Sequence, residues 1–533
     1  MCGISAYLGP KSGLHIAFNN LRKLEYRGYD SAGVAYFDTR EDGKPKLIFK
    51  KKPGKIEVLE REILGLQSIP QTAVIAHTRW ATHGVPNEAN AHPHGDCEDR
   101  IAVVHNGIIE NYQELKEQLQ KRGHHFSSDT DTEVVAHAIE DALKTEKDFS
   151  KALEKTLKII RGAYALAIVY AREPRNLYFA RLGSPLVLGI GDGEYFLASD
   201  PTALAGLVDK VVYVEEGTRG KIELNRFTTF PAKPKIEPLT MSAEQAQKGN
   251  FPHFMLKEIM EIPEVITVAT RGRLLAGGKG VKLGGLTNVE AKIKKAGRFE
   301  IIACGTAYHA GMVAKRWFEE IAGIPTDVWY ASEYRYAKTP TQPGTASVVI
   351  SQSGETADTL AALRKAKAAG YLTLGVVNVV GSTIARETDA GVYNHAGPEI
   401  SVASTKAFMS QLAVLLLIAC RVAGKTAKTK KILKELAVIP GKIKSILRGH
   451  KAIGEIAAKY VGAKNVLYIG REYNYAVALE GALKLKEISY VHAEGFAAGE
   501  LKHGSIALID EETPTVVIAP KNELQEKMVS NIQ

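Results

Sequence analysis

The amino-terminal part of the chain alternates short apolar runs with turn residues, a pattern that predicts β-strands. The predicted strands are Val74–Ala76, Ile101–His105, Tyr164–Tyr170, Leu177–Ala180, Leu186–Ile190, Tyr195–Ala198 and Val211–Val214. Gly191, Asp192 and Gly193 form a turn signal that joins two of these strands as a hairpin. Apolar residues recur at helical spacing in Tyr112–Lys121 and Glu133–Leu143. The pattern therefore predicts a mixed α+β domain over residues 1–240.

The apolar pattern dissolves between residues 226 and 252, where prolines and polar residues are typical of irregular structure, and we place a linker at 241–252. Beyond the linker, each predicted strand is followed by a turn of small residues and a helical pattern. These strands are Phe299–Ala303, Ser347–Ile350, Leu372–Val377, Asn465–Gly470 and Thr515–Pro520. Strands that alternate with helices predict α/β domains with doubly wound parallel sheets. We place one such domain at 253–428 and a second, shorter one at 429–533.

The composition is that of a folded globular protein, since 45% of the 533 residues are apolar and 24% are charged. At ~150 residues per domain, this length suits about three domains. The longest apolar run, Leu412–Cys420, falls well short of the ~18 residues needed to cross a bilayer. The first residues resemble no export signal. We therefore expect a cytoplasmic protein that has no membrane segment.

The chain carries a net charge of +10, and segment 425–451 is visibly basic. Apolar residues recur at helical spacing in this segment, which predicts one or two amphipathic helices with a solvated basic face. No nucleic-acid-binding motif accompanies the charge, so we expect an anionic small substrate rather than nucleic acid. Cys2, Cys97, Cys304 and Cys420 lack CxxC spacing and predict neither a disulfide framework nor a zinc finger.

Cys2 follows the initiator methionine, so removal of Met1 would place a free α-amine beside its thiol. An α-amine titrates near ~8 and can accept the thiol proton, which gives one residue both the nucleophile and the base for acyl transfer. Taken alone, however, a cysteine at this position is more often incidental.

Four ordered motifs change that interpretation: EYRGYDSAG at 25–33, HTRWATHG at 77–84, HNG at 105–107 and TDTE at 130–133. Through these motifs the first domain resembles the amino-terminal-nucleophile glutamine amidotransferases. The resemblance implies that Cys2 attacks the glutamine amide and releases glutamate and ammonia. It also implies an oxyanion hole made by Asn106 and the N–H of Gly107. The glutamine-binding residues that it implies are Arg79, Thr82, His83 and Asp131.

Two of these features have other interpretations. Asp131 stands just ahead of a predicted helix, so spacing alone supports a helix N-cap as well as a substrate contact. His77, His83, His92 and His94 suggest a metal, but no carboxylate or thiolate at ligand spacing completes a tetrahedral set. We expect structural histidines here, with no metal and no cofactor.

The segment Ser-Gln-Ser-Gly-Glu-Thr at 351–356 lies between a predicted strand and a helix that begins near Thr356. Hydroxyls and backbone N–H groups at a helix N-terminus can cradle a phosphate. The alternative is a polar turn with an ordinary Ser or Thr cap. The chain has no P-loop motif, which disfavours nucleotide hydrolysis.

Together with ACGT at 303–306 and VASTK at 402–406, this loop resembles the sugar-isomerase fold that binds hexose phosphates. The order of domains, with segments 479–488 and 499–504, resembles the isomerising glutamine:fructose-6-phosphate aminotransferase family. That resemblance implies the synthesis of glucosamine-6-phosphate from fructose-6-phosphate and glutamine, with ammonia passed internally. The implied sugar-phosphate-binding residues are Thr306, Ser351, Gln352, Ser353, Thr356, Val402, Ser404 and Glu480.

Glu480, Lys484 and Glu487 lie at i, i+4 and i+7, on one face of a predicted helix. Such a face is usually a solvated row of weak ion pairs. The family resemblance instead implies that Glu487 moves a proton between C1 and C2 of the sugar, with Lys484 as a supporting charge. It assigns ring opening to His503, whose ordinary pKa suits proton exchange near neutrality. It also implies that Trp80 gates the ammonia passage, and a homodimer through the sugar-isomerase domains in which His503 serves the neighbouring protomer.

The match with the family is incomplete at two places. Ala307 stands where many relatives have serine, so one phosphate-binding hydroxyl is missing. The chain ends at Gln533, before the tail whose lysine forms the sugar imine in relatives. We expect a fragment of a longer chain, or else a glutaminase with sugar-phosphate-binding domains that lacks synthase activity. Two rivals are an amidotransferase with another acceptor, for which no pyrophosphate-binding loop is found, and a sugar-phosphate sensor with a vestigial glutaminase.

Overall fold

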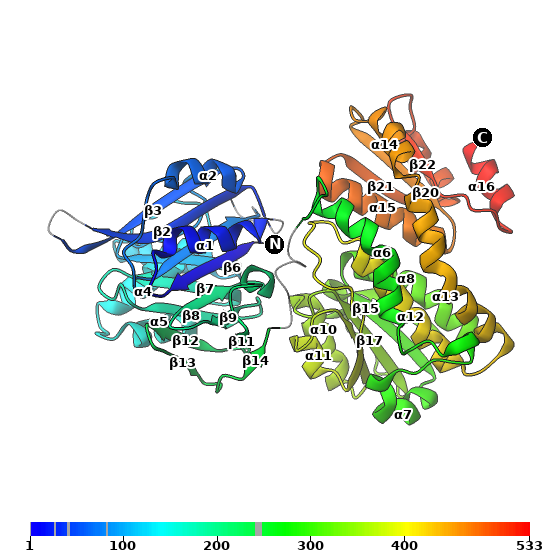
Figure 1. Cartoon of the computed structure of the whole chain (residues 1–533), viewed down its shortest axis with the longest axis horizontal. Coiled ribbons are helices and arrows are strands. Elements are labelled where there is room, and N and C mark those ends of the chain that lie inside the picture. Colours follow the sequence, from blue (N-terminus) through cyan, green and yellow to red (C-terminus); the bar gives the residue numbers. More distant parts are fainter. Residues whose placement is uncertain (1, 26–27, 40–42, 81–83, 240–247) are drawn as a thin grey trace. The chain divides into compact units, whose positions relative to one another are not determined.

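The computed structural model describes residues 2–25, 28–39, 43–80, 84–239 and 248–533. The chain forms two compact units, Met1–Gln247 and Lys248–Gln533 (Figure 1). Most of the predicted linker, 241–252, lies outside the described residues.

The amino-terminal unit contains two antiparallel sheets among its described residues. The larger consists, in spatial order, of β14 (Ile236–Pro238), β11 (Lys210–Tyr213), β9 (Val187–Ile190), β10 (Tyr195–Ala198), β1 (Gly3–Leu8), β4 (Val74–Arg79), β2 (Ser31–Thr39) and β3 (Pro45–Pro53). The smaller consists of β13 (Arg226–Phe230), β12 (Arg219–Glu223), β8 (Leu177–Leu182), β7 (Gly162–Tyr170), β6 (Ile101–Ile109) and β5 (His94–Gly95).

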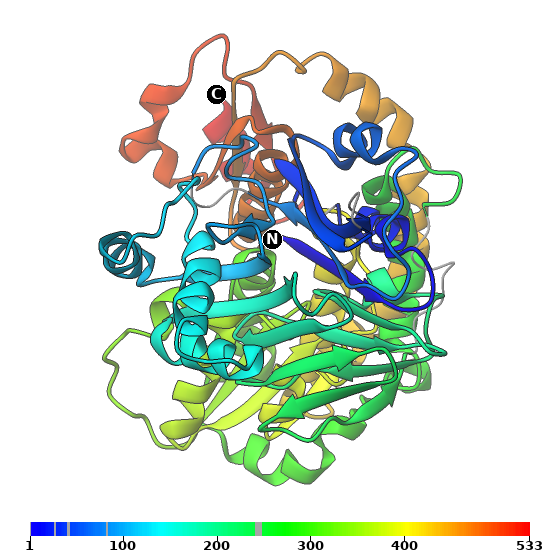
Figure 2. The ribbon, with the colours of Figure 1, turned by 90° about the vertical axis from the view of Figure 1, so that its left-hand side faces the viewer.

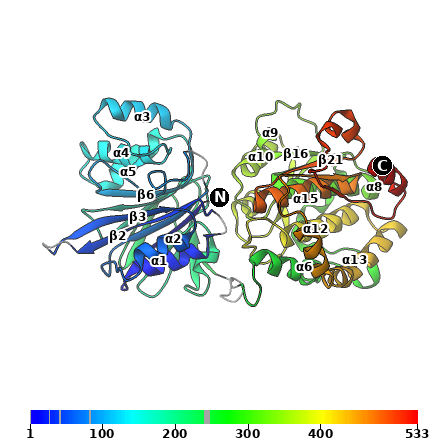
Figure 3. The same ribbon diagram turned by 90° about the horizontal axis from the view of Figure 1, so that it is seen from above.

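The two sheets pack face to face, with Ile4, Ile75 and Val104 in the core between them. Helices α1 (Gly13–Arg22) and α2 (Ile56–Ile63) pack on the outer face of the larger sheet. Helices α3 (Tyr112–Lys121), α4 (Glu133–Leu143) and α5 (Phe149–Ile159) pack on the outer face of the smaller one. Figure 3 shows these two groups of helices on opposite sides of the strands, and Figure 2 views the same unit from another direction. The unit is thus a sandwich of four layers.

The strands and helices predicted for this unit are all present, and α3 and α4 have the predicted bounds. The predicted hairpin turn joins β9 and β10, and Gly193 adopts a φ of +66° there. The prediction of irregular structure after residue 226 is wrong, because β13 and β14 lie in that segment. Both are short strands at the edges of their sheets, where proline is tolerated.

The carboxy-terminal unit contains the predicted parallel sheet. In spatial order its strands are β16 (Thr326–Tyr330), β15 (Arg298–Ala303), β17 (Thr345–Ser351), β18 (Leu372–Val377) and β19 (Ala390–Tyr393). The chain leaves β15 first towards β16 and then crosses to β17 on the other side of β15. Such a reversal opens a crevice at the carboxyl ends of the strands, where α/β proteins bind their ligands.

Helices cover both faces of this sheet. Helices α8 (Gly305–Ala322) and α12 (Lys406–Ala423) pack on one face. Helices α9 (Ala331–Tyr334), α10 (Ala357–Ala368) and α11 (Thr383–Glu387) pack on the other. In the described part of the chain, α12 alone is long and apolar enough to cross a membrane, and 67% of it is buried inside the unit. Its apolar character is therefore accounted for by its place in the core.

A smaller parallel sheet follows, with strands β21 (His492–Ala497), β20 (Asn465–Gly470) and β22 (Thr515–Val517) in spatial order. Helix α15 (Tyr473–Ser489) packs on this sheet and on α8. The remaining helices are α6 (Phe254–Thr270), α7 (Glu290–Lys295), α13 (Ala427–Leu447), α14 (His450–Ala458) and α16 (Gln525–Ile532). Helix α13 confirms the prediction for the basic segment, since Leu433 and Leu436 are buried and the lysines lie outside.

Candidate functional site

The pleat of three strands brings the predicted glutaminase residues to one end of the sandwich. Successive side chains of a strand point to opposite faces, so His77 and Arg79 share the inner face of β4 with Ile75. Asn106 shares the inner face of β6 with Val104 in the same way. Cys2 immediately precedes β1, which lies next to β4.

Cys2 is held by contacts from both sheets. The backbone N–H of Trp80 donates to Cys2 Sγ over 3.3 Å. Asn106 Nδ2 donates to the Cys2 carbonyl over 2.9 Å. The thiol and the side-chain amide are therefore adjacent, as an attacking sulfur and an oxyanion donor must be.

The orientation of the Asn106 amide follows from its partners. The Cys2 carbonyl only accepts hydrogen bonds, so Asn106 presents Nδ2 to it and turns Oδ1 towards His77 Nε2, which is 3.0 Å away. His77 Nε2 also lies 3.0 Å from the carbonyl of His105. Both partners of this nitrogen are acceptors, so Nε2 carries the proton. Burial lowers the pKa of His77 to about 3, which keeps the imidazole neutral.

Arg79 and Asp131 are both buried beside this centre. Burial lowers the pKa of Arg79, whereas the charges of Cys2, Asp131 and Asp30 raise it. Asp131 Oδ2 accepts a hydrogen bond of 2.7 Å from the N–H of Ile109. The N-cap interpretation of Asp131 is not supported, because Thr132 is the N-cap residue of α4.

Gly107 is required by the close approach of β6 to β7. Its φ is +137°, and a Cβ at this position would lie 1.9 Å from the carbonyl oxygen of Ala163. Only glycine can therefore adopt this backbone conformation next to Asn106, because any side chain at this position would collide with β7.

The remaining histidines of this region tie the motif segments together. His92 Nδ1 accepts from the N–H of His105 over 3.3 Å, and its ring stacks on His77 with centroids 4.1 Å apart. His94 Nε2 lies 3.1 Å from the hydroxyl of Thr130. Burial lowers the pKa of both His92 and His94 well below its ordinary value. His83 and Thr82 lie outside the described residues.

The indole of Trp80 lies next to Tyr29, with ring centroids 5.5 Å apart and an edge-on geometry. The backbone N–H of Trp80 donates to Cys2 Sγ, and Trp80 directly follows β4, the strand that carries Arg79. The structure thus places the Trp80 backbone at the thiol and the indole against Tyr29.

In the carboxy-terminal unit, the predicted phosphate loop lies at the switch point of the five-stranded sheet. β15 and β17 are neighbours, and Ala303 pairs with Ile350, so the loops after both strands leave the same edge. Ser351 Oγ lies 2.9 Å from Thr356 Oγ1 and accepts from the N–H of Gly354 over 3.0 Å. Ser353 Oγ accepts from the N–H of Glu355 over 3.1 Å.

Thr356 is the N-cap residue of α10, but its side chain makes no capping hydrogen bond. The Thr356 hydroxyl therefore does not serve as an ordinary helix cap, and it forms a hydrogen bond with the Ser351 hydroxyl instead. The loop gathers hydroxyls at the positive end of a helix dipole, the arrangement that suits a phosphate. Gln352 supplies a backbone carbonyl to the N–H of Asn378.

Two charged residues of α15, Glu480 and Lys484, contact α8 and are largely shielded from water. Glu480 is buried and accepts from the hydroxyl of Thr306 over 3.0 Å. Lys484 Nζ donates to the same hydroxyl over 2.8 Å and pairs with Glu487 at 2.9 Å. The interpretation as a solvated ladder is therefore wrong for Glu480 and Lys484, whose side chains are only 8% and 15% exposed.

Three predicted residues lie elsewhere in this unit. Ser404 Oγ donates to Glu399 over 2.7 Å in the loop before α12, and Val402 in the same loop is 40% exposed. His503 is exposed in a short helix at 500–503, and the structure describes no contact between it and Lys484 or Glu487. Ala307 is buried in the core of this unit.

Family models match both units. A glutamine amidotransferase domain matches residues 77–206, and a SIS domain matches 292–421 and 459–533. A glutamine–fructose-6-phosphate aminotransferase (isomerizing) of Chlorobaculum tepidum is 47% identical and is aligned with all of this chain and 88% of its own length. The enzyme of that name from Aquifex aeolicus gives the same identity and coverage.

This chain belongs to the isomerizing glutamine–fructose-6-phosphate aminotransferase family. A solved structure of the C-terminal domain of the family member from Francisella tularensis has 40% identity and a TM-score of 0.52, and it covers 54% of this chain and 81% of its own. Membership in the family confirms the predicted fold, an α+β glutaminase unit followed by α/β sugar-isomerase sheets.

Sequence reasoning expected His77 to be a structural histidine but did not foresee its contact with Asn106, and it missed His309. His77 lies two residues before Arg79 on a strand, which was the available signal that the two share one face. His309 Nδ1 lies 2.7 Å from Glu480 Oε2, and its place one helical turn after Thr306 was the signal. Both hold a predicted site residue in position.

Proposed function

We propose that this chain converts fructose-6-phosphate and glutamine into glucosamine-6-phosphate and glutamate, the reaction for which its relatives are named. The observation that carries the proposal is the meeting of Cys2, Trp80 and Asn106 at one end of the sandwich. The similarity to these relatives covers the whole chain, which supports proposing the reaction with the sugar as well as the hydrolysis of glutamine.

In the amino-terminal unit, the α-amine exposed by removal of Met1 accepts the proton of the Cys2 thiol. The sulfur attacks the glutamine amide carbon, and the oxyanion accepts hydrogen bonds from Asn106 Nδ2 and the N–H of Gly107. Ammonia leaves, and water hydrolyses the thioester to glutamate. The N–H of Trp80, which donates to Cys2 Sγ, stabilises the thiolate.

Recognition of glutamine falls to residues around this centre. The guanidinium of Arg79 pairs with the α-carboxylate, a task that suits its planar donor pattern. Asp131 holds the α-amine, and the Ile109 N–H that donates to its Oδ2 fixes the position of the carboxylate. Thr82 and His83 add further contacts.

In the carboxy-terminal unit, the phosphate binds at the N-terminus of α10. The hydroxyls of Ser351, Ser353 and Thr356 receive it, and Gln352 and Thr306 flank it, with Val402 and Ser404 on the next loop. Glu487 transfers the proton between C1 and C2 of the sugar. Lys484 links this carboxylate to Thr306 and Glu480, so that the base is positioned together with two residues of the proposed sugar-phosphate site.

The remaining assignments concern assembly. Ammonia is passed internally with the indole of Trp80 as its gate, because free ammonia at neutral pH is mostly protonated and not nucleophilic.

The exposure of His503 agrees with a homodimer formed through the sugar-isomerase sheets, in which this residue opens the sugar ring in the neighbouring site. The protein acts in the cytoplasm and binds neither nucleic acid nor membrane.

The test incubates the protein with glutamine and fructose-6-phosphate and measures glutamate and glucosamine-6-phosphate separately. The proposal expects both products, and glutamate should form faster when fructose-6-phosphate is present. Glutamate without any hexosamine phosphate would favour a glutaminase with a sugar-phosphate-binding unit instead. Neither product would contradict the proposal entirely.

A further inference from the structure

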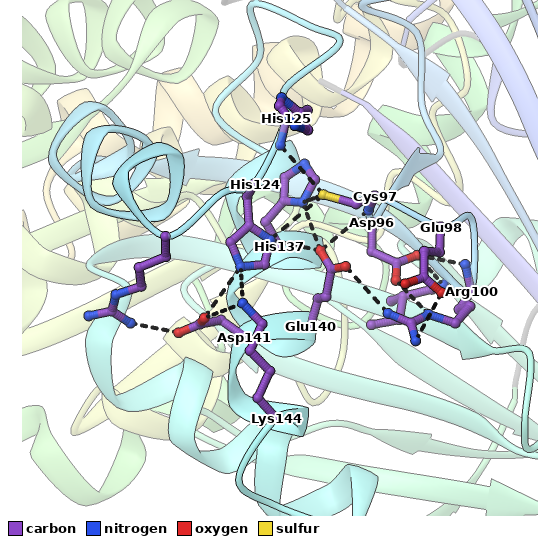
Figure 4. Close-up of polar contacts among 12 residues, drawn as sticks. Asp96, Cys97, Glu98, Arg100, His124, His125, His137, Glu140, Asp141 and Lys144 are labelled. Carbon is purple, nitrogen blue, oxygen red and sulfur yellow. Dashed lines mark hydrogen bonds and ion pairs between the residues drawn. The ribbon is translucent and has the colours of Figure 1, made fainter.

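A cluster of four potential metal ligands lies in the amino-terminal unit, made of side chains that the proposed reaction does not use. Cys97 precedes β6, His124 follows α3, and His137 and Glu140 lie on α4 (Figure 4). One ligand atom from each residue lies within 4.8 Å of all the others. His124, His137 and Glu140 are buried, whereas Cys97 is exposed and leaves a path for an ion.

The distances among these atoms resemble the edges of a tetrahedron around one ion. Cys97 Sγ lies 3.8 Å from His124 Nδ1 and 3.6 Å from His137 Nδ1. Glu140 Oε2 lies 2.8 Å from His124 Nδ1 and 3.2 Å from His137 Nδ1. Zinc bonds of ~2.3 Å to sulfur and ~2.0 Å to nitrogen or oxygen, set at tetrahedral angles, place ligand atoms about 3.3–3.6 Å apart.

The outer nitrogens of both imidazoles face carboxylates. His124 Nε2 lies 3.3 Å from Asp141 Oδ1, and His137 Nε2 lies 3.6 Å from Glu133 Oε1. Arg122 and Lys144 pair with Asp141, and Lys144 Nζ also lies 3.2 Å from His124 Nε2. A carboxylate that binds the outer nitrogen of a ligand histidine fixes the ring and directs the other nitrogen at a metal, and Asp141 lies in this position for His124.

We propose that Cys97, His124, His137 and Glu140 bind a structural zinc ion. A thiolate, a carboxylate and two neutral imidazoles carry a charge of −2, which balances Zn²⁺. The mixture of sulfur and imidazole ligands favours zinc over magnesium or calcium, which prefer oxygen. With four protein ligands the site is closed, as in structural rather than catalytic zinc sites.

The ion would connect two elements that carry the glutaminase residues. The loop with Cys97 leads into β6, which bears Asn106, and α4 begins two residues after Asp131. A bond from each element to one ion would hold their relative position during thermal motion. The zinc therefore acts on stability, and no step of the reaction passes through it.

The test uses full-length, untagged protein in which Cys2→Ala removes the catalytic thiol as a competing ligand. The protein is treated with a chelator, dialysed, given one equivalent of zinc and passed through gel filtration, after which the metal content is measured. We expect about one zinc per chain and a higher unfolding temperature than for the chelated protein. Cobalt in place of zinc should give a thiolate-to-cobalt charge-transfer band and the intense visible bands of a tetrahedral site.

Two neighbouring histidines provide a matched pair of variants. His124→Gln should weaken zinc binding at least about 100-fold, since outer-shell changes alone cost 10–100-fold. His125→Gln should leave zinc binding unchanged, because the His125 side chain is exposed and only its backbone N–H contacts Cys97 Sγ. Cys97→Ser should abolish the charge-transfer band.

Fewer than about 0.1 zinc per chain after reloading would overturn the proposal and leave a hydrogen-bonded cluster of the same side chains. Equal zinc binding by the His124→Gln and His125→Gln variants would overturn it as well. If a variant does not fold, the cobalt spectrum of the protein with all four ligands still decides, because a bound ion without a thiolate band contradicts the site.

Discussion

The two candidate sites are built in opposite ways. The glutaminase site is assembled from strand residues whose side chains point to the buried face of the sheet. There the neutral imidazole of His77 fixes the orientation of the Asn106 amide. The sugar-phosphate site is assembled from loop hydroxyls at the ends of parallel strands, with a paired lysine and two carboxylates brought by a separate helix. In the glutaminase site, strand pairing sets the positions of the reactive groups. In the sugar-phosphate site, the parallel sheet supplies the loops at the carboxyl ends of its strands, and the packing of α15 on α8 supplies the charged side chains.

The strongest way to separate the two sites is to remove the nucleophile. Cys2→Ala should lower glutamate release at least ~1,000-fold, because no other group in the centre can form the thioester. Synthesis of glucosamine-6-phosphate from added ammonium salt should persist in this variant. Loss of the ammonia-dependent reaction as well would show that the two sites do not work independently.

The converse experiment removes the proposed base of the sugar site. Glu487→Gln should lower glucosamine-6-phosphate formation about 100-fold or more while sparing glutamine hydrolysis, since a positioned base contributes ~10²–10⁴-fold. Glu455→Gln on α14 changes an exposed carboxylate and serves as the control. Equal loss of both activities in Glu487→Gln would contradict the division of labour.

A third experiment tests whether the buried histidine positions the oxyanion donor. His77→Leu leaves Asn106 Oδ1 without its partner, so kcat for glutamine hydrolysis should fall about 10–100-fold, with little change in KM. His77→Gln can still donate to Asn106 and should recover part of the loss. If both variants behave alike, the hydrogen bond from His77 to Asn106 is not what matters.

The smallest effect concerns stability, and it has opposite signs in the two units. In the amino-terminal unit, burial depresses the pKa of His77 and His94 below the unfolded value of ~6.5, so stability falls as pH drops below that value. In the carboxy-terminal unit, burial and Glu399 raise the pKa of Glu258 to about 7. Its contribution is present below the unfolded value of ~4.5 and is lost as pH rises through 7.

Glu258→Gln isolates this difference. The variant retains the oxygen that accepts from the N–H groups of Ile400 and Ser401 but cannot ionise. It should be more stable than the parent by about 1–3 kcal/mol at pH 8 and nearly equal to it at about pH 4, below the unfolded pKa, as measured by thermal unfolding. Glu264→Gln, an exposed position on the same helix, is the control. A gain that does not depend on pH would point to packing instead of ionisation.

Sequence reasoning succeeded where a pattern is local. Helices α3 and α4 and strand β18 have the predicted bounds, because their periodicity is complete within each segment. It missed β1, whose residues are buried on both faces and show no alternation, and β3, whose lysines are typical of an edge strand but resemble a loop.

The sites follow the same rule. The motifs point to Cys2, Arg79 and Asn106, but their mutual contacts depend on strand pairing that spacing does not reveal. The cluster around Cys97 escaped the search for ligand spacing because its partners lie 27 to 43 residues away and meet only in the folded unit. The expectation that no metal binds this chain rested on spacing alone.

The narrow gap at Gly107 has a consequence for laboratory evolution. Because a Cβ there would press 1.9 Å from a strand carbonyl, a saturation library at this codon should return glycine and nothing else among active clones. At Gly193 the φ is also positive but the surroundings are open, so asparagine or aspartate should survive there. Selection should therefore constrain these two glycines, which both have a positive φ, to very different degrees, and of the two only Gly107, beside the proposed oxyanion donor, should be irreplaceable.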